Sequence, residues 1–267
     1  MIFYDAHNHL HDARLQAHAA AIDAMLQHLP LRMAVVNGTE ESDWDAVAAM
    51  ARERAWVRPA FGLHPWHVAG RSAHWLVRLI ERLDAAPRAI IGEIGLDRWI
   101  EGYDFPAQTE VFGAQMELAA KRNLPAAIHC LKAWGALGDY VRSHPTAECG
   151  FLLHSYGGPV EMVEGFVERG AYFSFSAYFL HERKAAQREV FREIPLERLL
   201  VETDAPDMPP PAERNIHPLT NPATGEPIND PANIEVAYAG LAEVRGLQLE
   251  ELAEIVAKNF QRLYGWA

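Results

Sequence analysis

Short runs of apolar and β-branched residues recur along the chain, and longer amphipathic stretches separate them. A short apolar run bounded by turn residues is typical of a buried strand, so the runs predict eight strands. These are Ile2–Asp5, Met33–Asn37, Val57–Leu63, Ala89–Ile94, Ala126–His129, Phe151–His154, Tyr172–Phe175 and Leu199–Glu202. Apolar residues at helical spacing predict helices at Leu15–Leu29, Asp43–Arg54, Trp75–Asp84, Gln108–Arg122, Met162–Arg169, Ala185–Glu193 and Leu249–Tyr264.

The alternation of strands and helices predicts an α/β protein with parallel strands. Eight such units of about 30 residues match a single-domain (β/α)₈ TIM-type barrel over residues 1–267, which the last helix is expected to close. A doubly wound open sheet is the alternative architecture. No G-x-G-x-x-G sequence follows an early strand, however, so the usual signature of that fold is missing.

The segment from Ala205 to Pro231 holds eight of the 17 prolines and cannot form a helix or a central strand. It is either a surface linker or a stiff loop over the mouth of the barrel. Its position directly after the eighth predicted strand favours the loop.

Composition narrows the class of protein. A hydrophobic content of 49% is that of a globular domain, and the formal net charge of −12 disfavours a basic wrap around long duplex DNA. Two cysteines, Cys130 and Cys149, provide neither a disulfide framework nor a CxxC site. The sequence shows no bilayer-spanning stretch and starts without the pattern of a secretory signal, so we expect a cytoplasmic protein that does not bind membranes.

Titratable side chains stand at the carboxyl ends of the predicted strands. They are His7 and His9 after the first strand, Glu93 on the fourth, His129 on the fifth, His154 on the sixth and Asp204 after the eighth. In a barrel these ends form one rim, where active sites of this fold are built. Four imidazoles and two carboxylates meeting there would be poorly paired unless cations bind between them. The pattern therefore predicts a metal centre with nitrogen and oxygen ligands.

Each of these residues also has a structural interpretation. His7 and His9 point the same way in an extended segment and suit one ion, but they could also be solvated in a turn. Glu93, near Gly92 and Gly95, could form a buried salt bridge, and Asp204 could cap a helix. His129 and His154, taken singly, could be hydrogen-bonded core histidines.

Other histidines divide into two groups. His64 and His67 follow the third strand, so they contact either a substrate oxyanion or only the surrounding structure. The rest have no rim position and are expected at the surface: His11, His18, His28, His74, His144, His181 and His217.

Taken together, the motifs closely resemble those of the TatD-like metal-dependent hydrolases, which belong to the amidohydrolase-type barrels. The matching segments are Asp5-Ala6-His7-Asn8-His9, Gly62-Leu63-His64-Pro65, Gly92-Glu93-Ile94-Gly95-Leu96-Asp97, Leu124-Pro125, Ile128-His129, His154-Ser155-Tyr156-Gly157-Gly158, Glu202-Thr203-Asp204-Ala205-Pro206 and Asn259-Phe260. The resemblance implies a barrel with two divalent ions, and Zn, Mn, Mg and Co are all compatible with the ligands.

The resemblance also implies roles for single residues. His7 and His9 would bind one ion, Glu93 would bridge to a second ion on His129 and His154, and Asp204 would bind the first ion and activate water. Asp204 and Glu93 are thus the expected catalytic residues, and His64, His67 and Ser155 the expected substrate contacts, with His64 facing a phosphate. Asp5 and Asp97 are expected to orient the imidazoles.

Two departures surround the site: Arg98-Trp99-Ile100 follows Asp97, where many relatives have an aromatic pair, and Cys130-Leu131-Lys132 follows His129, where an arginine is usual. They bear on the substrate rather than on hydrolysis. Aromatic side chains that could stack bases, or simply pack, are Trp66, Trp99, Trp134, Tyr156 and Tyr178.

The expected function is a phosphodiesterase or deoxyribonuclease of the 3′-5′ exonuclease type, which uses a hydroxide bridged by the two metal ions. Its substrate would be a phosphate ester, such as the end of a single-stranded DNA or a small nucleotide, and no obligate protein partner is expected. Hydrolysis of an amide or ester, such as an aminoacyl linkage, is an alternative because the same nucleophile attacks carbonyls. A non-catalytic barrel with a structural metal is a third.

Overall fold

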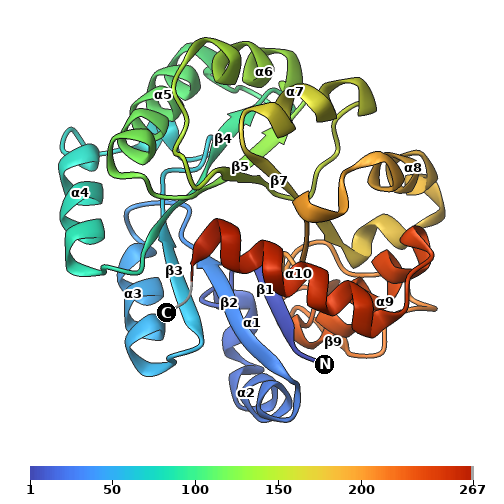
Figure 1. Ribbon diagram of the computed structural model, residues 1–267. Helices are drawn as coiled ribbons and strands as arrows, with labels where there is room; N and C mark the ends of the chain where they lie inside the picture. The colour runs from blue at the N-terminus through green and yellow to red at the C-terminus, as the bar shows by residue number, and fades with distance from the viewer. Residues whose placement is uncertain (266–267) are drawn as a thin grey trace.

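The computed structural model describes residues 1–265 and contains an eight-stranded parallel sheet whose strands follow one another in chain order (Figure 1). The strands are β1 (Phe3–Asn8), β2 (Leu31–Asn37), β3 (Val57–Phe61), β4 (Ile90–Asp97), β5 (Ala126–Leu131), β6 (Phe151–Leu153), β7 (Ala171–Ser176) and β8 (Leu199–Glu202).

The sheet curls until its last strand lies beside its first. The Asp204 amide donates to the His7 carbonyl at 3.0 Å, and the His9 amide donates to the Ala205 carbonyl at 2.7 Å, so the chain segments after β8 and at the end of β1 are joined. The protein is therefore a nearly closed (β/α)₈ barrel, as predicted, and the sequential strand order excludes the doubly wound alternative. The predicted single domain spans residues 1–267, of which residues 266–267 lie outside the described residues.

Helices surround the sheet (Figure 1). The α-helices are α1 (Ala13–Gln16), α2 (Ala19–His28), α3 (Trp44–Glu53), α4 (Trp75–Ala85), α5 (Phe105–Arg122), α6 (Trp134–Ser143), α7 (Val163–Glu168), α8 (Ala185–Glu193), α9 (Ile234–Arg245) and α10 (Leu249–Tyr264). Short 3₁₀ helices lie between them: η1 (Val68–Gly70), η2 (Val160–Met162), η3 (Ala177–Leu180), η4 (Glu182–Lys184), η5 (Leu196–Arg198) and η6 (Pro231–Asn233).

Three helical regions differ from the sequence prediction. The helix expected at Leu15–Leu29 is divided between α1 and α2 by a turn, where the His18 ring lies 2.9 Å from the Thr220 carbonyl oxygen. Helix α6 contains Gly135 and Gly138, whose low helical propensity hides it in the sequence. Helix α9 is buried on most of its circumference, so it has no one-sided apolar pattern to reveal it.

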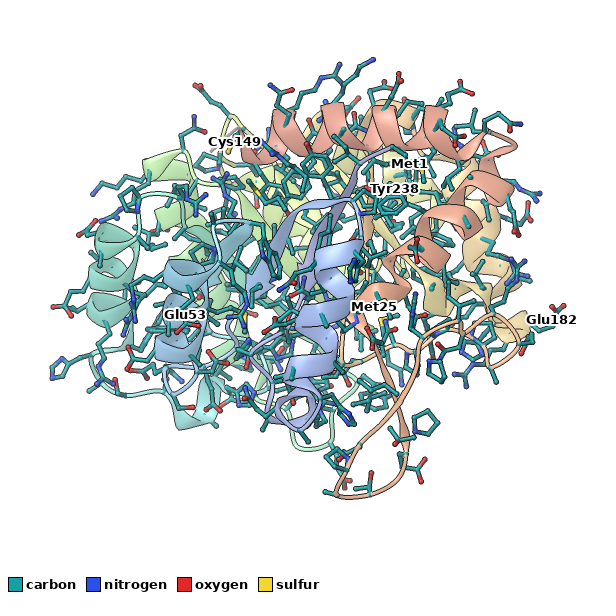
Figure 2. All side chains as sticks on the ribbon, turned by 90° about the horizontal axis from the view of Figure 1, so that it is seen from below. Met1, Met25, Glu53, Cys149, Glu182 and Tyr238 are labelled. Atoms are coloured by element: carbon teal, nitrogen blue, oxygen red, sulfur yellow. The ribbon has the colours of Figure 1, made fainter. Side chains whose placement is uncertain are left out.

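Helix α10 closes the amino end of the barrel, as expected. Asn259 donates to the backbone oxygens of Leu196 at 2.7 Å and Leu199 at 2.8 Å, where β8 begins. Figure 2 shows Met1 and Cys149, which precede β1 and β6, near α10 at one end of the molecule. The opposite end is the carboxyl rim on which the predicted site residues stand.

The proline-rich segment borders this rim and folds back on itself as a hairpin of β9 (Pro218–Thr220) and β10 (Pro227–Asn229). It projects from the lower end of the molecule in Figure 2. Arg14 of α1 ion-pairs with Asp207 at 2.8 Å, and the Asn229 amide group donates to the Thr203 carbonyl at 2.7 Å, so the segment is tied to α1 and to the residue that follows β8. It is therefore an ordered loop beside the mouth rather than a linker.

Within the described residues, no helix is both long and apolar enough to cross a bilayer. The cytoplasmic location stays a prediction.

Candidate metal centre

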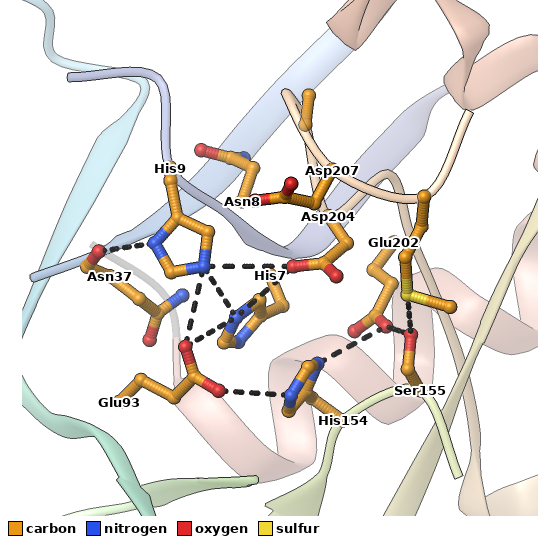
Figure 3. Close-up of polar contacts among 12 residues, drawn as sticks. His7, Asn8, His9, Asn37, Glu93, His154, Ser155, Glu202, Asp204 and Asp207 are labelled. Carbon is orange, nitrogen blue, oxygen red and sulfur yellow. Dashed lines mark hydrogen bonds and ion pairs between the residues drawn. The ribbon is translucent and has the colours of Figure 1, made fainter. Parts of the chain in front are cut away.

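The structure brings together the six side chains that the sequence singled out, at the carboxyl rim of the barrel. Figure 3 shows His7, His9, Glu93, His154 and Asp204. His7 stands inside a strand rather than after it, because β1 continues to Asn8. Glu93 was expected near the end of the fourth strand and lies in the middle of β4. Strand pleating carries both side chains into the cluster, where His7 is fully buried and Glu93 is nearly so.

One oxygen of Glu93 faces the first group of candidate ligands. Its Oε2 atom lies 3.4 Å from His7 Nε2 and 3.3 Å from His9 Nε2, and the two imidazole nitrogens are 3.3 Å apart. Asp204 Oδ1 lies 3.6 Å from each nitrogen. Among the described residues, no helix begins at Asp204, so Asp204 is not a helix cap. Its carboxylate faces the two histidines instead.

The second oxygen of Glu93 faces the other group. Its Oε1 atom lies 3.3 Å from His129 Nδ1 and 3.0 Å from His154 Nε2, and these nitrogens are 3.3 Å apart. Glu93 thus lies between two pairs of histidines and presents one oxygen to each.

These separations test whether metal ions suit the cluster. Bonds of about 2.0–2.1 Å from a tetrahedral ion hold its ligand atoms about 3.3–3.4 Å apart. The edges of the first group measure 3.3 to 3.6 Å and those of the second 3.0 to 3.3 Å. Imidazole nitrogens and carboxylate oxygens are also suitable ligands for divalent ions. The two groups of residues therefore fit divalent metal ions.

Two further carboxylates hold the second pair of histidines. Asp97 Oδ2 lies 2.9 Å from His129 Nε2, as the sequence led us to expect. Glu202 Oε1 lies 3.6 Å from His154 Nδ1, and the Glu202 carboxylate accepts hydrogen bonds from Ser155 and Ser174. Glu202 was not among the site residues predicted from the sequence. Its spacing from Asp204 could have indicated it, because residues two apart on an extended chain point the same way and Glu202 precedes Asp204 by two.

Asp5 supports the first pair through the backbone. It accepts from the His7 amide at 3.2 Å, from Asn8 at 3.0 Å and from the Thr203 hydroxyl at 2.6 Å, so it joins β1 to the end of β8. Burial raises its pKa to about 7 despite these hydrogen bonds.

The electrostatics of the cluster favour positive charge around Glu93. Burial alone raises the pKa of Glu93, but the imidazoles of His64, His154 and His7 outweigh burial and hold that pKa well below its ordinary value. Burial lowers the pKa of His9, but the neighbouring carboxylates of Asp204 and Glu93 outweigh burial and raise it well above its usual range. Carboxylates that stabilise protonated imidazoles in this way also stabilise bound cations.

The expected substrate contacts take different positions. His64 is buried, lies 3.5 Å from Glu93 Oε1, and has its pKa lowered to about 4 by burial. His67 is more exposed and lies 3.8 Å from Glu40 Oε2, at the edge of the cluster. The Ser155 hydroxyl donates to Glu202. Their contacts with substrate stay predictions.

His11 was predicted at the surface, and this prediction is wrong. Its side chain is 8% exposed, its ring lies 6.1 Å from that of His9, and its Nε2 atom lies 3.4 Å from Asp43 Oδ2. The chain turns back after His9, and so brings His11 beside the rim. Of the other histidines, His28, His74 and His144 are exposed as expected, whereas His18, His181 and His217 are half-buried.

The aromatic residues considered for base stacking differ in how exposed they are. Tyr156 is fully buried and packs on Trp134 with ring centroids 4.7 Å apart, so Tyr156 belongs to the core. Trp134 and Tyr178 are half-buried, whereas Trp66 and Trp99 are exposed.

Comparison with known families gives an independent result. Residues 4–265 match the family described as TatD related DNase, which is nearly the whole chain. The chain belongs to the TatD-related DNase family. This membership confirms the resemblance noted in the sequence and makes the protein an enzyme of the hydrolase class.

Relatives with curated names match this TatD-family protein over most of their length. The uncharacterized metal-dependent hydrolase YjjV of Escherichia coli is 29% identical over 232 residues, which cover 86% of this chain and 85% of the relative. The 3′-5′ ssDNA/RNA exonuclease TatD of Enterobacter lignolyticus is 30% identical over 261 residues, or 96% and 94% of the two chains.

Solved structures agree with the TatD barrel. The crystal structure of Escherichia coli YjjV superposes with a TM-score of 0.89 at 25% identity, covering 99% of this chain and 98% of that one. A TatD-family hydrolase from Entamoeba histolytica gives 0.85 at 20% identity, with the same coverage, and so supports the fold.

Proposed function

We propose that this protein is a divalent-metal-dependent phosphodiesterase that removes nucleotides from the 3′ end of single-stranded DNA. The observation that carries the proposal is the position of Glu93 between two histidine pairs, with ligand separations suited to two ions. The exonuclease name of the Enterobacter lignolyticus relative supports the choice of substrate.

In this proposal, His7, His9 and Asp204 hold one ion and His129 and His154 hold a second, with Glu93 shared between them. Zn, Mn, Mg and Co remain compatible with these ligands. When bound, the ions would neutralise phosphate oxygens and lower the pKa of water. Among the described residues, no lysine or arginine hydrogen-bonds or ion-pairs with these six, so cations must be supplied from outside the chain.

The side chains divide the remaining work. Asp204, at the edge of the cluster, accepts a proton from the attacking water. Asp97 and Glu202 hold the rings of His129 and His154 in the orientation that directs one nitrogen of each at Glu93. His64, whose lowered pKa keeps its ring neutral near pH 7, faces the substrate phosphate and donates a hydrogen bond to it.

The test uses metal-depleted protein reloaded with each divalent ion in turn. We expect stepwise shortening of a single-stranded DNA from its 3′ end, no reaction in chelator, and a loss of about 10²- to 10⁴-fold in kcat for Asp204→Ala, because the proton acceptor is gone. The matched control is Asp207→Ala, a nearby exposed aspartate on the same loop.

Parallel assays on aminoacyl esters decide between the alternatives. Hydrolysis of acyl substrates alone would replace the phosphodiesterase with an amide or ester hydrolase. Metal binding without turnover on either class would indicate a non-catalytic barrel.

A further inference from the structure

Two tryptophans beside the candidate metal centre expose their rings. Trp66 is 45% exposed and Trp99 is 58% exposed, although they belong to different loops, one after β3 and one after β4. A single exposed aromatic residue is ordinary on a protein surface. Two on loops that bond the same buried group, next to an active-site rim, require a reason.

Asp97 is that shared group. Trp66 Nε1 donates to Asp97 Oδ2 at 2.7 Å, and the Trp99 backbone amide donates to Asp97 Oδ1 at 2.5 Å. The same Asp97 Oδ2 atom lies 2.9 Å from His129 Nε2. One fully buried carboxylate therefore holds the Trp66 ring, the backbone at Trp99 and a candidate metal ligand.

The anchored Trp66 ring stands at the edge of the cluster. Its centroid lies 5.0 Å from the His64 ring and 6.1 Å from the His129 ring, with both pairs packed edge to face. Its only polar atom is already bonded to Asp97, so the exposed part of the ring offers an apolar surface in a fixed orientation. Such a surface binds aromatic groups at low entropic cost.

The net charge of the chain indicates which part of a nucleic acid would bind to this ring. The chain has a formal net charge of −12, so a polyanionic substrate gains little affinity from long-range attraction. Stacking on a neutral base is insensitive to this charge and to base identity, since every base has a π-face.

We propose that Trp66 and Trp99 form a stacking subsite for nucleobases of the substrate, next to the position of the scissile phosphate. This inference rests on the proposed phosphodiesterase function and names how its substrate is recognised. Loss of one stacked base is expected to weaken binding by about 5- to 150-fold.

Four variants test the subsite. Trp99→Ala removes a ring but keeps the backbone hydrogen bond to Asp97, and Trp66→Leu removes the other ring together with its N–H. Trp66→Phe keeps an aromatic ring, although a smaller one, and loses the N–H, and so separates stacking from the positioning of Asp97. Val77→Ala, an exposed apolar position on α4, is the matched control.

The variants are compared on two single-stranded DNA oligonucleotides, one ordinary and one with abasic residues at its 3′ end. KM and kcat are measured with metal, and binding is measured in chelator by anisotropy of a 5′-labelled strand. A dinucleotide in the same assays shows whether small nucleotides use the subsite as oligonucleotides do.

For the wild type, we expect the abasic strand to have a higher KM and weaker binding by the factor above. Trp99→Ala and Trp66→Leu should weaken binding of the ordinary strand and leave that of the abasic strand unchanged, so the difference between the strands shrinks. Trp66→Phe should keep most of the base preference.

Cleavage of both strands with equal KM in the wild type, or an unchanged base preference in Trp99→Ala and Trp66→Leu, overturns the subsite while leaving the phosphodiesterase intact. If neither strand is cleaved with any metal, the proposed function fails first, and base-dependent binding in chelator then decides the subsite alone.

Discussion

Glu202 shows how one residue beyond the predicted ligands can shape the centre. It is fully buried on β8, accepts from Ser174 at 2.5 Å and from Ser155, and lies 3.6 Å from His154 Nδ1. Burial raises the pKa of Glu202, but the neighbouring His154 imidazole outweighs burial and lowers that pKa, so the residue is an anion. An anion there fixes which ring nitrogen of His154 faces Glu93.

We predict that Glu202→Gln weakens metal binding by about 10- to 100-fold, because His154 loses the charge that orients it. Calorimetric titration of metal-depleted protein measures the change. Glu254→Gln, the same substitution at an exposed position on α10, is the control and should bind as the wild type does. Equal affinity in Glu202→Gln would show that Glu202 only satisfies the two serines.

At the scale of elements, the approach of β4 to β5 positions His129. A Cβ atom on Gly95 would lie 2.0 Å from the His129 carbonyl oxygen, so no larger residue fits unless the strands move apart. The sequence places Gly95 two residues after Glu93 but does not show which backbone it meets.

We therefore predict that Gly95→Ala destabilises the protein by about 1–3 kcal/mol, because the strands must shift to admit the methyl group. Gly165→Ala on α7, where nothing lies within 4 Å of the new Cβ, should instead stabilise by about 0.5–1 kcal/mol. Urea unfolding of the two variants measures both changes. Equal effects of the same sign would contradict the argument from strand packing.

Strands and helices could be predicted from the sequence where burial leaves a recognisable apolar pattern. All eight strands were found, because each has a short apolar run. Helix α9 was missed because it is buried on most sides, and the turn within Leu15–Leu29 was missed because it meets β9, which lies about two hundred residues away in the chain.

At the scale of the whole molecule, the net charge and the charge near the candidate metal centre have different effects on a phosphate substrate. The formal net charge is −12, while the candidate centre gathers imidazoles around Glu93. Bound ions would make the rim locally attractive to one phosphate, although the molecule as a whole repels a polyanion.

This contrast predicts a weak salt dependence. Proteins that neutralise many phosphates lose affinity steeply with salt, with a slope of about −0.7 per contact for single strands. For this protein we expect KM for a single-stranded DNA to change by less than about threefold between low and moderate KCl concentrations, because long-range repulsion is screened as local contacts weaken. Steady-state kinetics at fixed metal concentration measures it, and a rise of several hundredfold would reveal a cationic binding surface.

The sequence by itself determined the barrel and the rim cluster. Alternating strands and helices leave few topologies, and parallel strands bring their carboxyl ends to one edge, so His7, Glu93 and Asp204 could be placed together without coordinates. Only the tertiary structure decided that Glu202 supports His154, that His11 turns in beside His9, and that Asp97 anchors the Trp66 ring and the backbone at Trp99. Such contacts depend on loop paths and side-chain directions, which neighbouring elements set and no local pattern records.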